Sequence, residues 1–90
     1  MTKAELCRAI AQKTGLQIKE TTEVLEAFID IVQSELTKGE KVTLRGFGTF
    51  KKKHRPERKA RNLSNGTEVV VPARDVVHFI PSSQFFEEIN

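Results

Sequence analysis

The residues with the most chemistry to offer form one basic segment, residues 51–62, with the sequence KKKHRPERKARN. This segment holds seven Lys or Arg against a single acid, Glu57, so its net charge is +6, whereas the whole chain of 90 residues carries +3. Seven cations cannot share a buried core, because each would lose its hydration without a partner. We therefore expect the segment to project into solvent or onto a polyanion. Nucleic acid is the first candidate, and an acidic protein or a lipid surface is the second.

Other reactive residue types are too sparse to build a catalytic or metal site. The single cysteine, Cys7, excludes an intrachain disulfide, suits a reducing cytoplasm and is interpreted as a small helix-packing residue. The two histidines, His54 and His78, are interpreted as solvated or strand-packed residues rather than metal ligands. With no nucleophile–base pair, carboxylate cluster or metal motif, we expect no catalytic residue, no metal and no cofactor.

Length and composition indicate one small domain over residues 1–90. A hydrophobic content of 38% is too high for a disordered tail and too low for a membrane protein. The sequence has neither an apolar run of about 18 residues nor the pattern of a signal peptide. We divide the domain into a helical dimerisation body with the first strand (1–50), a β-ribbon arm (51–75), and a last strand with a C-terminal helix (76–90). The expected location is the cytoplasm, without a membrane partner.

A short helix is predicted over residues 1–14. Thr2 and Glu5 form a capping-box pair, and Thr14-Gly15 supplies the stop.

A second, longer helix is predicted over residues 18–38 and ends at Lys38-Gly39. Its apolar residues keep the spacing of one helix face, which Val24 and Ile31 widen. The first helix is too short to cover so wide a stripe. We therefore expect a partner chain to cover it.

After the helices, the period of the apolar residues changes to two, which predicts a strand through Val42 and Leu44. The Gly46-Phe47-Gly48 sequence then predicts a tight turn or bulge that presses Phe47 into the core. A phosphate-binding loop is not expected here, because no GK[ST] motif and no strand–loop–helix context follow.

The basic segment is expected to form one leg of a protruding hairpin. Asn65-Gly66 is a strong hairpin-turn signal, Thr67 to Val71 reads as the returning strand, and Pro72 makes this leg an edge or a bend. Twelve residues extend about 40 Å at about 3.3 Å each, whereas a compact domain of this size has a radius of gyration of ~12 Å. Much of the hairpin must therefore protrude.

The chain is expected to return to the core through its last apolar residues, Val76, Val77, Phe79 and Ile80. Pro81-Ser82-Ser83 then predicts the start of a short final helix. Asp75 beside Arg74 is interpreted as a local surface pair. The resulting fold class is α+β, with an N-terminal helical pair, an antiparallel sheet with a long β-ribbon arm, and a short C-terminal helix.

At GFGTF, followed by R-x-x-R-x-x-R-N and a hairpin tip, the chain resembles the bacterial histone-like DNA-bending proteins, HU and integration host factor. The likeness extends over the whole chain through T-K-x-E-L, GEKVTLRGFGTF, V-V-P-A and the F-x-P before the last helix. The resemblance implies an intertwined dimer, in which each subunit wraps a β-ribbon arm along the DNA minor groove and a proline at the arm tip wedges between base pairs.

The resemblance also supplies an expected set of site residues. Arg55, Arg58, Lys59 and Arg61 are similar to the arm cations of the family, Asn62 to its tip asparagine, and Lys3 to a lysine of its body. With the neighbouring basic and tip residues, the expected DNA-binding set is Lys3, Lys52, Lys53, Arg55, Arg58, Lys59, Arg61, Asn62, Leu63 and Asn65. The expected dimer core is Leu25, Phe28, Ile29, Val32, Leu36, Phe47, Phe50 and Phe79.

The chain departs from the family pattern at three places. The Asn-Pro tip of the family is Asn62-Leu63 here, and leucine is also an intercalating side chain in other minor-groove proteins. Ser82-Ser83 replaces the common Gly-Lys. The last helix carries Glu87-Glu88 where the family often has lysines, and these acids repel phosphate.

These features predict an architectural protein that bends and compacts double-stranded DNA with low sequence specificity and prefers distorted DNA. A homodimer is expected first and a heterodimer second, associated with the nucleoid. One alternative is a basic-arm module for RNA or an acidic partner that does not bend DNA, and another is a nuclease-like enzyme. Each feature also has an interpretation without a binding function. The basic segment could be a charged strand that protects a sheet edge from aggregation, and Leu63 could be a merely exposed tip residue.

Overall fold

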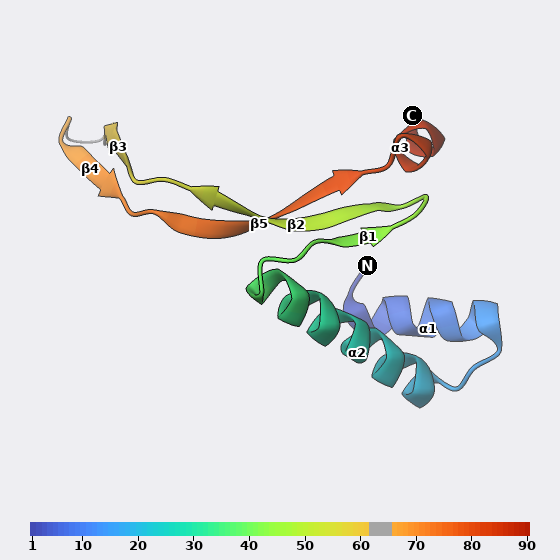
Figure 1. The fold of residues 1–90 in the computed structure, drawn as a ribbon. Coiled ribbons are helices and arrows are strands. Elements are labelled where there is room, and N and C mark those ends of the chain that lie inside the picture. The colour runs from blue at the N-terminus through green and yellow to red at the C-terminus, as the bar shows by residue number, and fades with distance from the viewer. Residues whose placement is uncertain (62–65) are drawn as a thin grey trace. The chain divides into compact units, whose positions relative to one another are not determined.

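A computed structural model gives the fold and describes residues 1–61 and 66–90 (Figure 1). The described residues form two compact units, Met1–Ser34 and Glu35–Asn90. The elements in chain order are α1 (Lys3–Thr14), α2 (Ile18–Thr37), β1 (Val42–Leu44), β2 (Gly48–Arg55), β3 (Arg58–Arg61), β4 (Glu68–Val71), β5 (Arg74–Pro81) and α3 (Ser83–Ile89).

Helix α1 begins at Lys3, two residues after the predicted start, and its caps are the residues that the sequence predicts. Thr2 has an extended backbone, and its Oγ1 accepts a hydrogen bond from the Glu5 N–H at 3.2 Å. Gly15 adopts the left-handed conformation, with φ 80°, and its N–H donates to the Ala11 carbonyl at 2.8 Å. These caps satisfy backbone groups that the helix itself leaves without partners.

Helix α2 ends in a Schellman motif. The Gly39 N–H donates to the Leu36 carbonyl at 3.0 Å, and the Glu40 N–H donates to the Glu35 carbonyl at 2.9 Å. Gly39 has φ 83°, a conformation that favours glycine, so the predicted stop at Lys38-Gly39 is confirmed. The helix proper ends at Thr37, one residue before the predicted boundary.

The first hairpin of the sheet turns tightly between β1 and β2. The Phe47 N–H donates to the Leu44 carbonyl at 3.0 Å, and Gly46 sits at the third turn position with φ 83°, which that turn requires. Gly48 then allows β2 to approach β5 closely. A Cβ atom at Gly48 would lie 2.6 Å from the Ile80 carbonyl oxygen and 2.5 Å from Cζ of Phe79. The predicted tight turn at Gly46-Phe47-Gly48 is confirmed.

Strands β2 and β5 form a long antiparallel ribbon, and β1 adds to the other edge of β2 (Figure 1). Cross-strand pairing runs from Gly48↔Pro81 to Arg55↔Arg74. After two unpaired residues on each leg, the same register resumes in β3 and β4, from Arg58↔Val71 to Arg61↔Glu68.

The two breaks in the ribbon both contain proline, which has no N–H to offer to the strand ladder. They are Pro56-Glu57 on the outgoing leg and Pro72-Ala73 on the returning leg. The break at Pro72 agrees with the predicted bend. The one at Pro56 was not predicted from the sequence.

An aromatic cluster forms the centre of the Glu35–Asn90 unit. The Phe47 ring lies 5.0 Å from those of both Phe79 and Phe85, and the Phe50 and Phe79 rings are 4.9 Å apart. Helix α3 begins beside this cluster, where Ser82 Oγ accepts a hydrogen bond from the Phe85 N–H at 3.1 Å. The helix start predicted at Pro81-Ser82-Ser83 is therefore confirmed.

Two apolar residues of β5 do not enter the core as the sequence predicted. Val77 is 67% exposed and Ile80 is 43% exposed. Val77 pairs with Lys52, beyond the last aromatic pair, where the sheet has only two strands. Ile80 pairs with Thr49, one residue out of step with the Phe50–Phe79 pair, so it lies on the other face of the ribbon.

Candidate nucleic-acid interface

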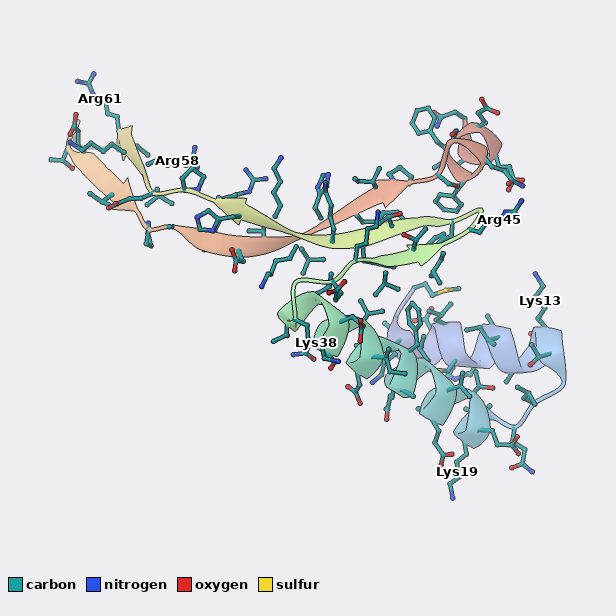
Figure 2. All side chains as sticks on the ribbon, viewed as in Figure 1. Lys13, Lys19, Lys38, Arg45, Arg58 and Arg61 are labelled. Carbon is teal, nitrogen blue, oxygen red and sulfur yellow. The ribbon has the colours of Figure 1, made fainter. Side chains whose placement is uncertain are left out.

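The ribbon concentrates the positive charge of the chain on a narrow, exposed element. Residues 51–75 include eight Lys or Arg against three acids. All eight cationic residues are exposed. Figure 2 shows Arg58 and Arg61 on β3, toward one end of the ribbon, and Arg45 near the β1–β2 turn at the other end. Such an arrangement can meet a polyanion along its length.

Strand pairing sorts the inner ribbon, β2 with β5, into two faces, because directly opposed residues share a face and neighbours alternate. One face, which we call the ring face, begins with Phe50 and Phe79. It continues outward with Lys52 opposite Val77 and ends with His54 opposite Asp75. The ring face therefore runs on from the aromatic cluster.

The opposite face, which we call the cation face, holds no acid along the paired residues 48–55 and 74–81, all of which the structure describes. Its Lys and Arg residues are Lys51, Lys53, Arg55 and Arg74. The remaining positions of the face are Thr49, Val76, His78 and Ile80. The two faces thus differ sharply in charge.

Asp75 neutralises part of the ring face. Its Oδ1 lies 2.9 Å from Nδ1 of His54, and its Oδ2 lies 3.7 Å from Nζ of Lys52. An ionised carboxylate only accepts hydrogen bonds, so His54 Nδ1 is the donor. The hydrogen bond from His54 and the nearby charge of Lys52 hold the pKa of Asp75 below its ordinary value. The predicted local pair of Asp75 with Arg74 is wrong, because the side chains of adjacent strand residues point to opposite faces.

The outer ribbon, β3 with β4, is cationic on one strand and mainly apolar on the other. Arg58 and Lys59 of β3 directly oppose Val71 and Val70 of β4. Val70 is 54% exposed. Strand β3 is therefore largely cationic. Strand β4 is apolar except for its first residue, Glu68, which opposes Arg61.

A hollow of about 480 Å³ lies where the two parts of the ribbon meet. Its lining includes both prolines of the breaks, and its four cationic residues are Lys53, Arg55, Arg58 and Arg74. None of the lining residues, all within the described chain, is an acid.

The structure brings most of the predicted DNA-binding residues together. Lys52, Lys53, Arg55, Arg58, Lys59 and Arg61 all lie on β2 and β3 of one ribbon. Lys3 lies in the Met1–Ser34 unit, where its Nζ is 3.3 Å from the Glu26 carboxylate. The predicted tip residues Asn62, Leu63 and Asn65 lie outside the described residues.

The predicted dimer-core residues differ in burial within this single chain. Leu36 is buried, whereas Ile29 and Phe47 are 45% and 37% exposed. The intermediate ones are Leu25, Phe28, Val32, Phe50 and Phe79. Their role in a dimer stays a prediction.

Two cations of the cation face, Lys51 and Arg74, were missing from the set predicted from the sequence. The alternation of Lys51, Lys53 and Arg55 was a usable signal, since positions two apart share a strand face. Arg74 could not be added without the register, which alone places it opposite Arg55.

Within residues 1–61 and 66–90, no three His, Cys, Asp or Glu side chains gather as a metal site. None of the helices in this described part is both long and apolar enough to cross a membrane.

Comparison with known proteins identifies the family. The family model described as bacterial DNA-binding protein matches residues 1–90. The chain belongs to this family of bacterial DNA-binding proteins. Membership confirms the resemblance to HU and integration host factor and the expectation of a binding protein rather than an enzyme.

Individual relatives support the same family. The chain is 42% identical over 90 residues to DNA-binding protein HU of Geobacillus stearothermophilus, covering 100% of both chains. It is 37% identical over 91 residues to the integration host factor subunit beta of Marinobacter nauticus, covering 100% of this chain and 93% of the relative.

A solved structure of an Anabaena HU–DNA cocrystal matches the fold with a TM-score of 0.90 and 34% sequence identity. The match covers 99% of this chain and 97% of the Anabaena chain. It confirms the predicted α+β class, with two N-terminal helices, an antiparallel sheet with an extended arm, and a short C-terminal helix.

Proposed function

We propose that this member of the bacterial DNA-binding protein family is an architectural protein that acts as a dimer and holds bent double-stranded DNA between two minor-groove arms. The observation that carries the proposal is the ribbon of β2–β5 and β3–β4, which keeps one register from Gly48↔Pro81 to Arg61↔Glu68. The ribbon therefore presents eight exposed Lys and Arg residues, in a fold like that of the HU chain in the DNA cocrystal. Such a chain is expected in the cytoplasm, associated with the nucleoid.

Exposed apolar side chains support a dimer. Val24 and Ile31 of α2 are 66% and 61% exposed, and Phe86 and Ile89 of α3 are 54% and 68% exposed. Apolar surface of this kind on a small chain marks a site of association. We expect a second copy of the chain to cover it, with a related chain as the alternative occupant.

Salt dependence tests the two-arm embrace. If about four cations per arm meet phosphate, the dimer neutralises about eight charges, and log K should fall against log salt with a slope of about −7. A slope shallower than about −3 contradicts two arms on one duplex. The measurement is a titration of labelled duplex at several salt concentrations.

Leu63 is the proposed wedge of each arm. Unstacking a base step costs a few kcal/mol, so DNA that is already nicked should bind more tightly than intact duplex. Leu63→Ala should reduce both bending and the preference for nicked DNA, whereas Leu63→Pro should keep both. Equal affinity of the unmodified protein for nicked and intact duplex argues against a wedge.

Sequence preference should be weak, because minor-groove edges distinguish little beyond A·T from G·C. The cation face alone would also fit RNA or an acidic protein. A duplex with a fluorophore at each end separates the two functions, since an architectural protein shortens the end-to-end distance upon binding. Tight binding without shortening would favour the simple binding module.

A further inference from the structure

Arg55 and Arg74 face each other at the end of the inner ribbon, where the paired stretch stops. Directly opposed residues of an antiparallel pair have Cβ atoms about 5 Å apart, and like charges at this spacing are destabilising. An anion between the two guanidinium groups removes this repulsion. Arginine is also suited to this role, because its planar fork of donors matches two phosphate oxygens.

The surroundings of the pair supply no protein carboxylate to do this. Neighbouring cations on the same face are Lys53 and Lys51, and the remaining titratable side chain is His78. Asp75 follows Arg74 directly, but its carboxylate points to the other face, where it interacts with His54 and Lys52. In the part of the chain that the structure describes, no ion pair links Glu57, in the adjacent break, to either arginine.

The hollow at the breaks gives this pair room for a ligand. Arg55 and Arg74 line it together with Lys53 and Arg58, so four cations surround a volume of about 480 Å³. His54 and Val77 of the ring face also line the hollow, but the ring face has no pair of directly opposed cations. The ammonium group of Lys52 lies 3.7 Å from the Asp75 carboxylate, and the ring face leads into the aromatic cluster.

We propose that Arg55 and Arg74 form a two-arginine site for one phosphodiester group of the DNA backbone. In this arrangement the cation face meets the phosphates, and Lys52, on the ring face, does not, so the inference removes Lys52 from the DNA-binding set predicted from the sequence. Arg74 is thereby assigned as a DNA-contact residue on the returning leg of the arm. The inference rests on the proposed function, because it specifies which face of the arm that function uses.

Two variants of equal net charge test the assignment. Arg74→Gln and Lys52→Gln each remove one positive charge from the same ribbon, but from opposite faces. Binding to a nicked duplex should be titrated over a range of salt concentrations for both variants and for the unmodified protein. Arg74→Gln should lower the magnitude of the salt slope by about one per arm, whereas Lys52→Gln should leave it unchanged. Arg74→Lys should retain the slope but bind more weakly than the unmodified protein, because lysine cannot form the bidentate contact.

Thermal unfolding of the same variants distinguishes lost contacts from lost folding. Removing the repulsion should leave the Tm of Arg74→Gln equal to or above that of the unmodified protein. A clear fall in Tm with an unchanged salt slope would overturn the assignment, since Arg74 would then have a structural role. Equal loss of slope in Arg74→Gln and Lys52→Gln would also overturn it, because general charge would then explain binding. If the unmodified protein itself shows a slope shallower than about −3, the proposed function fails rather than the choice of face.

Discussion

The carboxylate of Asp75 is bound across the ribbon by His54, with 2.9 Å between Oδ1 and Nδ1. Asp75 belongs to the returning leg and His54 to the outgoing leg, in directly opposed register positions. The arm of a DNA-binding protein thus contains an acid that is satisfied internally. Because this acid lies on the ring face, it leaves the cation face free of negative charge.

The first prediction concerns the titration of Asp75. Its pKa should lie below the ordinary value of 3.8, mainly because of the hydrogen bond from His54. His54→Ala should therefore raise this pKa more than Lys52→Gln does. The measurement is the carboxyl ¹³C chemical shift of Asp75 as a function of pH in the three proteins.

The sign of the associated stability follows from the direction of this shift. A lowered pKa means that the contact stabilises the fold above the ordinary pKa, and that this contribution disappears as pH falls through the lowered value. Identical Asp75 titrations in all three proteins would show that the contact is not formed in solution.

The second prediction concerns Gly48. A Cβ atom there would meet the Ile80 carbonyl oxygen at 2.6 Å, and a backbone atom cannot simply move aside. Gly48→Ala should lower the free energy of unfolding by about 2 kcal/mol or more, through overpacking of the β2–β5 pair. Denaturant unfolding measures this change.

Gly39→Ala is the matched control for Gly48→Ala. The added methyl group at Gly39 meets open space, so only its positive φ of 83° opposes the substitution. The expected cost is about 1 kcal/mol. If Gly39→Ala costs as much as Gly48→Ala, the close approach of β5 at Gly48 is not the cause.

The third prediction concerns the start of α3. Ser82 Oγ accepts a hydrogen bond from the Phe85 N–H, whereas Ser83 is the first residue of the helix. Ser82→Ala should cost about 1 kcal/mol of unfolding free energy, and Ser83→Ala should be nearly neutral. Equal effects of the two substitutions would argue against the cap.

The fourth prediction concerns assembly. If a second copy covers α2, the Tm should rise with protein concentration, because association stabilises the folded state by mass action. Ile29→Lys places a charge on a residue that is 45% exposed in the single chain. This substitution should abolish the dimer in sedimentation experiments, while Ile29→Leu should retain it. A Tm independent of concentration, with Ile29→Lys still matching the unmodified protein, would exclude this interface.

The sequence was sufficient to predict features set by neighbouring residues. The caps at Thr2 and Ser82 and the stops at Gly15 and Gly39 depend on side chains and backbone angles within about four positions. The family resemblance extended this to the order of the elements and the basic arm.

Features that depend on strand pairing were harder to predict. The partner of Asp75 and the position of Arg74 follow from which residues oppose each other across the ribbon, and side-chain alternation alone does not give that register. The prediction that Val77 enters the core was wrong for a related reason. Its apolar side chain suited a core, but the sheet is only two strands wide where it lies.

The paired breaks at Pro56-Glu57 and Pro72-Ala73 have a mechanical consequence. Since both legs lose two ladder positions at the same level, the pairing on either side stays aligned, with Arg55 opposite Arg74 and Arg58 opposite Val71. Bending at this level disturbs fewer interstrand hydrogen bonds than bending anywhere else along the paired strands. The two breaks therefore form a hinge in the ribbon. By bending there, β3 and β4 can follow a curved surface while the cross-strand pairs on either side of the hinge are kept.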